Sequence, residues 1–181
     1  MRARAGGESG FTLVELLIAV TVLGVIMTAI AAGFSVGLRT MNDTSDRLAG
    51  SNDAQHLAVS LVPDVASATV AVAAADGAGI ACTGASNPVL QLSDGTSFNV
   101  VYGVRSVAGA STFQLERYVC TAGAVTSTRV VARNLASLTA AAPTRIPAGG
   151  TLAGASLTLT EKVTTTDAAY VFTVTGRRRT S

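Results

Sequence analysis

The feature that most constrains this chain is an apolar run near its N-terminus that contains a single charge. From Phe11 to Gly37 the one ionisable side chain is that of Glu15. At about 1.5 Å per helical residue, the run is long enough to cross a hydrocarbon core of about 30 Å. A carboxylate in hydrocarbon is costly, and intramembrane acids usually have a function, so the position of Glu15 requires an explanation.

Two interpretations of the apolar run leave this acid unexplained. The first is an ordinary N-terminal anchor, whose short end Arg2 and Arg4 would hold in the cytoplasm. The second is a secretory signal cleaved after Ala31, which ends the small-x-small sequence "AIA". The secretory interpretation also requires an apolar region longer than the usual ~7–15 residues.

A third interpretation accounts for the acid. The stretch "SGFTLVELLIAVTVLGVI", residues 9–26, closely resembles the N-terminal signature of type IV prepilins and the related pseudopilins. In that family a membrane peptidase removes a short basic leader after its final glycine, and the new N-terminal residue is N-methylated. The resemblance implies that prepilin peptidase cleaves after Gly10, that Phe11 becomes the methylated N-terminus, and that Glu15 is the family's glutamate.

Cleavage after Gly10 would also provide a partner for Glu15. The new ammonium on Phe11 would lie one helical turn before the acid, or on a neighbouring subunit of a filament. An ammonium nearby offsets the cost of burying a lone carboxylate. Because fixing register is the best-attested use of a buried polar pair, we interpret Glu15 as the residue that sets filament register.

Four segments are predicted along the chain: a leader peptide over residues 1–10, a transmembrane or filament-core helix over 11–38, an amphipathic helical extension over 39–68, and an extracytoplasmic β-rich head over 69–181.

The packed face of the helical extension is predicted from residue spacing. Met41, Leu48, Ala58 and Val62 recur near helical spacing, so we expect them to lie on the head. Pro63 should end or kink the helix, with residues 64–68 as a further turn.

After the helix, apolar residues recur at every second position instead of at helical spacing. Asp94-Gly95 is a hairpin turn signal, and small-residue, glycine-rich stretches at 71–85 and 140–154 are typical of loops. The predicted strands are 89–93, 97–104, 111–120, 127–135, 155–160 and 169–177. We therefore expect an α+β fold: a long protruding N-terminal helix whose C-terminal half packs on an antiparallel β-sheet, as in type IV pilins. The strand order is not predicted.

The two cysteines and the single histidine were considered for chemistry. An exported head favours a disulfide between Cys82 and Cys120, whereas a cytosolic chain would keep two thiols. These cysteines lack metal-ligand spacing, so neither a metal nor a cofactor is expected. His56 lies near Asp53 and Ser60, but no nucleophile motif accompanies them, and we interpret His56 as a surface residue.

The expected function is structural and not enzymatic: a minor pilin or pseudopilin. The resemblance implies other pilin subunits, prepilin peptidase and an inner-membrane assembly platform as partners, with membrane lipid before assembly. The chain would cross the inner membrane once and then enter an extracytoplasmic filament. Arg177 to Arg179 could contact nucleic acid, but binding requires several clustered cations, so a solvated tail is favoured.

Two alternatives to the filament subunit stay open. One is a singly anchored extracytoplasmic binding module that never polymerises, and the other is a protein secreted after cleavage at Ala31. The net charge of +2 gives no reason to propose an acidic partner. The sequence does not distinguish a pilus from a DNA-uptake or secretion filament.

Overall fold

The computed structural model describes residues 11–74, 82–97, 99–148, 151–162 and 169–179. The predicted leader, including Gly10, lies outside these ranges. The chain divides into two compact units, which we call unit 1 (Met1–Asn42) and unit 2 (Asp43–Ser181).

One helix, α1 (Leu13–Ser67), accounts for all of the helical structure expected from the sequence. Pro63 lies inside α1, which ends four residues later at Ser67. The last turn is closed by the amide of Ala68, which donates to the carbonyl of Asp64 over 3.0 Å. The further turn expected after Pro63 is therefore present.

The face of α1 that packs on the strands differs from the predicted one. The side chains that are fully buried in unit 2 are those of Leu57, Leu61 and Val65. The prediction is wrong for three of its four residues, since Met41, Leu48 and Val62 are exposed. At about 100° per residue, Leu48 lies on the opposite side of the helix from Leu57. The helical spacing of apolar residues alone therefore predicted the wrong face of α1 as the packed one.

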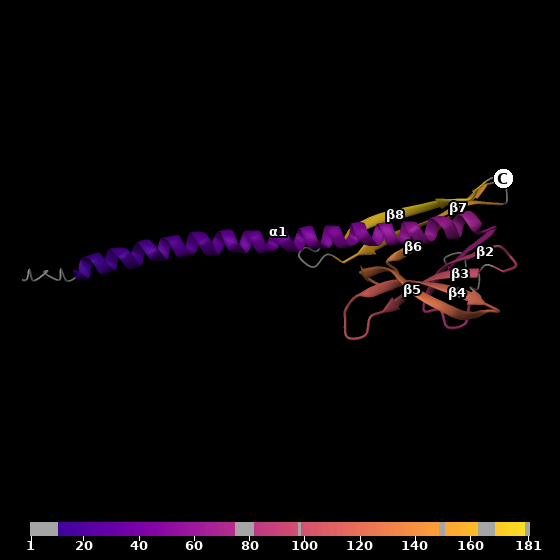
Figure 1. The fold of residues 1–181 in the computed structure, drawn as a ribbon, viewed down its shortest axis with the longest axis horizontal. Coiled ribbons are helices and arrows are strands. Elements are labelled where there is room, and N and C mark those ends of the chain that lie inside the picture. Colours follow the sequence, from indigo (N-terminus) through magenta and orange to yellow (C-terminus); the bar gives the residue numbers. More distant parts are fainter. Residues whose placement is uncertain (1–10, 75–81, 98, 149–150, 163–168, 180–181) are drawn as a thin grey trace, which may run out of the picture. The chain divides into compact units, whose positions relative to one another are not determined.

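In the described residues eight antiparallel strands follow the helix, which confirms the α+β class with one long N-terminal helix packing on an antiparallel sheet (Figure 1). Strands β1 to β5 pair in sequence order, and β7 then pairs with both β6 and β8. A single residue pair, Leu135 with Glu161, joins β5 to β7. The strands are β1 (Val70–Ala73), β2 (Pro88–Ser93), β3 (Asn99–Ser106), β4 (Phe113–Thr121), β5 (Ala124–Leu135), β6 (Ala141–Ala148), β7 (Thr151–Glu161) and β8 (Tyr170–Arg177).

Two stretches predicted as loops contain strands. All of β1 except Val70 lies in the predicted loop 71–85, and β6 with the start of β7 lies in the predicted loop 140–154. β6 carries Pro143 and Pro147, which is compatible with a strand because β6 ends the order of paired strands. Proline is tolerated on such edge strands, where its missing N–H removes no ladder bond. These strands were missed because the prediction relied on alternating bulky apolar residues, whereas these segments are rich in small residues and prolines.

The turn between β2 and β3 is longer than a two-residue hairpin. The ladder ends at the pair Ser93 and Asn99. The carboxylate of Asp94 accepts the amides of Thr96 and Ser97 at 2.8 and 2.9 Å, and Gly95 has φ of 86°. An acceptor side chain followed by a left-handed glycine closes this turn.

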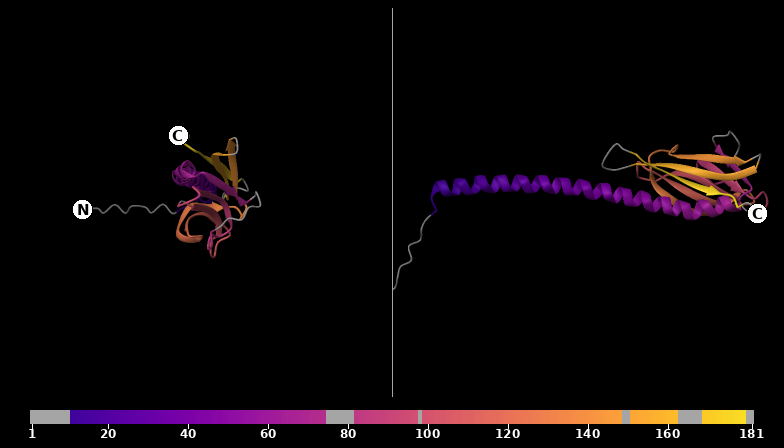
Figure 2. Two further views of the ribbon diagram at one scale, coloured as in Figure 1. Left: turned by 90° about the vertical axis from the view of Figure 1, so that its right-hand side faces the viewer. Right: turned by 90° about the horizontal axis from the view of Figure 1, so that it is seen from above.

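The main core of unit 2 lies between α1 and the strands, and close helix–strand contact depends on two glycines. A Cβ on Gly176 of β8 would lie 2.7 Å from the Cβ of Val65. A Cβ on Gly50 of α1 would lie 2.6 Å from the ring of Tyr170. The C-terminal turns of α1 therefore run beside β8, as the right-hand view of Figure 2 also shows.

Candidate functional site

The predicted processing and packing site lies at the start of α1. The helix begins at Leu13, and the hydroxyl of Thr12 accepts the amide of Glu15 over 3.3 Å. Thr12 is therefore the N-cap and Glu15 is the third helical residue, the two positions of a capping box. An acid in the first turn also interacts favourably with the helix dipole. The spacing T-x-x-E shows this local role, which the prediction of register did not include.

The apolar side chains of unit 1 have no packing partner within the described residues. From Phe11 to Leu38 every large apolar side chain is between 48% and 80% exposed. By length and apolar composition α1 could cross a membrane. A signal sequence near an N-terminus can have the same length and composition. A helix that is apolar on all faces is buried by lipid or by other helices.

The hydroxyl side chains of this helix donate to its own backbone, to carbonyl oxygens three or four residues earlier. Thr21 donates to Ile18 over 2.8 Å, and Ser35 donates to Ala31 over 2.9 Å. Because a polar group in hydrocarbon must be satisfied internally, these hydroxyls are compatible with lipid.

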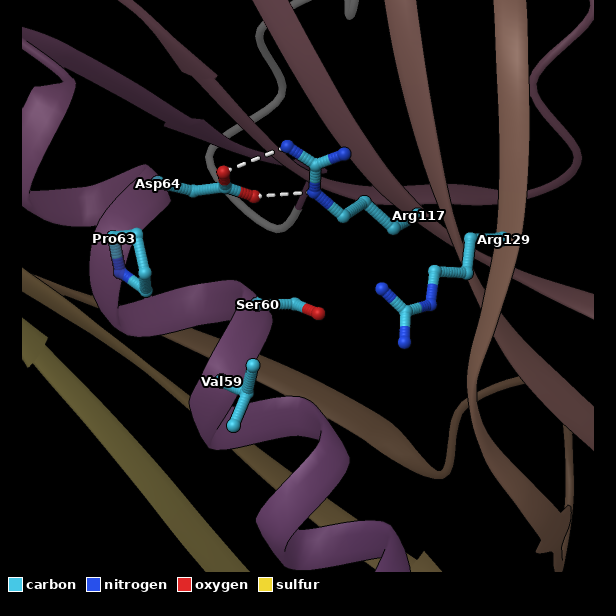
Figure 3. Close-up of a pocket in the computed structure, with 6 residues that line it drawn as sticks. All are labelled: Val59, Ser60, Pro63, Asp64, Arg117 and Arg129. Atoms are coloured by element: carbon cyan, nitrogen blue, oxygen red, sulfur yellow. Dashed lines mark hydrogen bonds and ion pairs between the residues drawn. The ribbon is translucent and has the colours of Figure 1, made fainter.

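In unit 2, Asp64 ties the last turn of α1 to two strands. Asp64 is 6% exposed, and its carboxylate accepts hydrogen bonds from both Nε and Nη2 of Arg117 at 2.7 Å (Figure 3). The hydroxyl of Tyr102 on β3 donates to the same carboxylate over 2.7 Å. Burial, and then Asp64, raise the pKa of Tyr102, while the hydrogen bond to Asp64 raises the pKa of Arg117. The cluster stays neutral overall and fixes where the helix meets the sheet.

A second buried carboxylate lies on the other face of β4. Glu116 is 2% exposed, and its carboxylate accepts hydrogen bonds from the hydroxyl of Tyr118 at 2.5 Å and from the side-chain amide of Gln114 at 2.6 Å. Nη1 of Arg105 lies 3.6 Å from Oε1 of Glu116. Burial first, and then the bond to Glu116, raise the pKa of Tyr118. β4 therefore carries satisfied charges on both of its faces.

A third buried acid, Glu161, has an incomplete set of partners. It is 5% exposed, and its Oε1 has no hydrogen-bond partner among the described residues. Burial, and then the neighbouring Asp53, raise the pKa of Glu161 to about 7. Asp53 accepts the backbone amide of Arg133 over 2.6 Å. The contact of α1 with β7 and β5 thus includes a carboxyl that changes charge near neutral pH.

The two cysteines form a disulfide in the structure. Cys82 and Cys120 have Cα atoms 6.0 Å apart and a sequence separation of 38. They belong to a small cluster with Val101 and Tyr118 on the face of the sheet away from the main core. By the loop-entropy model, closing a loop of this length stabilises the fold by about 4 kcal/mol.

The remaining polar residues considered in the sequence do not assemble into a reactive centre. His56 is exposed, and among the described residues no hydrogen bond joins it to Asp53 or Ser60. The part of the chain that the structure describes holds no group of three or more metal-ligating side chains. Arg177 ends β8, and the amide of Arg178 donates to the carbonyl of Ala153 over 2.9 Å.

Comparison with known families identifies the start of the chain. The model of the prokaryotic N-terminal methylation motif matches residues 6–31. Residues 6–31 carry the type IV prepilin signature. Neither the curated proteins nor the solved structures compared with the chain include a significant match. The similarity therefore covers the N-terminal segment and does not extend to unit 2.

The prepilin signature supports a type IV pilin-like precursor and suggests a structural subunit. It implies interaction with other pilin subunits and with prepilin peptidase. Together with the apolar helix, it suggests membrane anchoring before assembly.

Proposed function

We propose that this protein is a minor pilin or pseudopilin, a structural subunit of a type IV pilus-like or type II secretion-like filament. Prepilin peptidase removes the leader after Gly10, and Phe11 becomes the methylated N-terminus. The inner-membrane assembly platform then takes the subunit from lipid into the filament, where Glu15 sets its register. Residues 11–38 form the filament core, 39–68 the extension and 69–181 the head.

One observation carries the proposal: the methylation motif leads directly into a helix whose apolar side chains are exposed on every face. Such a helix requires lipid or copies of itself. Alanine and glycine within it support the second arrangement, because small residues allow helices to approach closely. A Cβ placed on Gly24 or Gly33 would meet nothing within 4 Å, so these glycines have no packing role inside unit 1.

The core and the disulfide of unit 2 support its role as the head. Its core is complete in itself, with the main cluster of buried side chains contributed by the second half of α1 and the strands. The disulfide fits an extracytoplasmic location, because such bonds persist in oxidising compartments.

The mature N-terminus tests the proposal. We expect intact-mass analysis of the protein purified from membranes to give residues 11–181 plus one methyl group. Gly10→Val should block this processing, while the matched leader variant Gly7→Val should be processed normally. A mature chain that begins at Met1 would instead support a plain anchor with a binding head. A chain that begins at Ala32 would support secretion.

A further inference from the structure

A small pocket in unit 2 lies between the end of α1 and the paired strands β4 and β5. Its volume is about 230 Å³. Figure 3 shows the hydroxyl of Ser60 and the guanidinium of Arg129 directed into the space between the helix and β5. The lining residues are Val59, Ser60, Pro63, Asp64, Arg117 and Arg129.

The two arginines of this pocket are in different electrostatic situations. Arg117 is matched by the bidentate contact with Asp64. Arg129 lies directly opposite Arg117 in the β4–β5 ladder, and no described residue forms an ion pair with it. Like charges directly across a ladder are destabilising. With Asp64 already occupied, the pocket keeps one unmatched positive charge.

The size and lining of the pocket suit a small acidic group. A drug-sized ligand usually needs about 300–1,000 Å³. One water takes about 30 Å³ of liquid, so a carboxylate on a short aliphatic stem fits this volume. Val59 and Pro63 provide apolar contact for the stem, and Val59 is 71% exposed. A guanidinium matches a carboxylate with two parallel hydrogen bonds.

We propose that this pocket binds a carboxylate group. The guanidinium of Arg129 holds the carboxylate through paired hydrogen bonds, and the hydroxyl of Ser60 is a second donor. Asp64 does not repel the ligand strongly because Arg117 neutralises it. The proposal does not depend on the filament assignment, since every lining residue belongs to unit 2.

A competing explanation gives Arg129 no ligand. Among the described residues β5 pairs with β7 only at its C-terminal end, at Leu135, so the part of β5 around Arg129 is a strand edge, and charges on edges discourage aggregation. An edge charge needs neither a pocket nor Ser60. Sensitivity to Ser60 therefore distinguishes the two explanations.

The experiment titrates the full chain, in neutral detergent, with sodium acetate against sodium chloride at constant ionic strength. NMR signals of the arginine Nε–Hε groups report on each guanidinium. We expect a saturable shift of the Arg129 signal with acetate and not with chloride. Arg129→Gln should weaken acetate binding, read from neighbouring backbone amides, by about tenfold, because a charged hydrogen bond is lost. Ser60→Ala should weaken it by a smaller factor.

Arg133→Gln is the matched control, because Arg133 is an exposed arginine on the same strand and outside the pocket. It should bind acetate as the parent does. Equal shifts with acetate and chloride, or binding unchanged in Arg129→Gln, would overturn the proposal. An unchanged tyrosine fluorescence spectrum verifies that each variant is folded.

Sedimentation of the same samples distinguishes two possible sources of the carboxylate. If a second copy of the chain supplies the group, Arg129→Gln and added acetate should both weaken self-association. If the ligand is a free small carboxylate, self-association should be unaffected while acetate binding persists. Either result supports the site, whereas the absence of acetate binding would overturn the proposal.

Discussion

The two parts of α1 show how one continuous helix can depend on two different surroundings. In unit 1 each large apolar side chain is about half exposed or more, whereas Leu57, Leu61 and Val65 in unit 2 are fully buried. The chain itself provides the partner for the second part. For the first part the partner must come from outside, as lipid or as other helices. Burial within the chain therefore separates residues that stabilise the fold from residues available for assembly.

The acids of the two parts differ in the same way. Glu15 is exposed and lies in the first turn of the helix, where its amide is capped by Thr12. Asp64 is buried and accepts three hydrogen bonds from Arg117 and Tyr102. We thus expect substitutions that remove well-partnered buried side chains of unit 2 to lower stability, and substitutions in unit 1 to leave it unchanged.

The largest effect is expected for Leu61→Ala, compared with Leu17→Ala. Leu61 is fully buried, and truncation leaves a cavity that should cost about 3–4 kcal/mol. Leu17 is 58% exposed, and its truncation should change the free energy of unfolding by less than about 0.5 kcal/mol. Urea unfolding in detergent, followed by tyrosine fluorescence, reports on unit 2 because all three tyrosines lie there. Equal costs for the two variants would contradict the comparison.

Asp64→Ala should follow, with a loss of about 3 kcal/mol. The substitution leaves the guanidinium of Arg117 and the hydroxyl of Tyr102 without their partner, and an unpaired buried charge is costly. The exposed helix variant Gln55→Ala serves as the control. Replacing the ion pair in the double variant Asp64→Leu/Arg117→Met should recover part of the loss. A single variant as stable as the parent would show that the cluster does not hold the helix on the sheet.

Glu161→Gln should raise stability, and only at the higher pH. The pKa of Glu161 rises from 4.5 in the unfolded chain to about 7 in the fold. The fold therefore binds more protons between these values, so its stability falls as pH rises through 7. Allowing for partial screening, we expect Glu161→Gln to be more stable by about 2 kcal/mol at pH 8 and nearly unchanged at pH 5. Unfolding curves at both pH values measure this difference, and a gain of equal size at pH 5 would refute the titration of Glu161.

The smallest effect on stability, and the largest on assembly, is expected for Glu15→Ala. Glu15 is an exposed residue of unit 1, so the free energy of unfolding should change by less than about 0.5 kcal/mol. Leader cleavage should continue, while incorporation into filaments should be strongly reduced because the register contact is lost. Sheared filament fractions, compared with membrane fractions by immunoblot, measure incorporation. Thr12→Ala tests the capping role alone, and unimpaired incorporation of Glu15→Ala would remove the basis of the register hypothesis.

Much of the fold could be predicted from local patterns. The long helix, the antiparallel strands around residues 89–135 and the α+β class follow from a change of apolar period from helical to two. The strands β1 and β6 could not be predicted, because their small residues and prolines become strand-forming only when a neighbour pairs with them. The packed face of α1 was misassigned for a similar reason, since exposed residues such as Leu48 share the apolar character of buried ones.

The polar clusters were the least predictable part. Arg117 alternates with apolar residues along β4, which signals a charge directed inward. Its partner Asp64 lies 53 residues earlier, on another element. Nothing local links the two, and the pocket formed with Arg129 depends on the same long-range approach.

The sequence alone determined the N-terminal signature, the capping residues and the uninterrupted apolar helix, because each depends on residues within a few turns of one another. Only the tertiary structure decided which face of α1 is buried, which acids are paired and where an arginine is left unmatched. These features arise from contacts between distant segments, whose energies depend on packing and burial that no local pattern records.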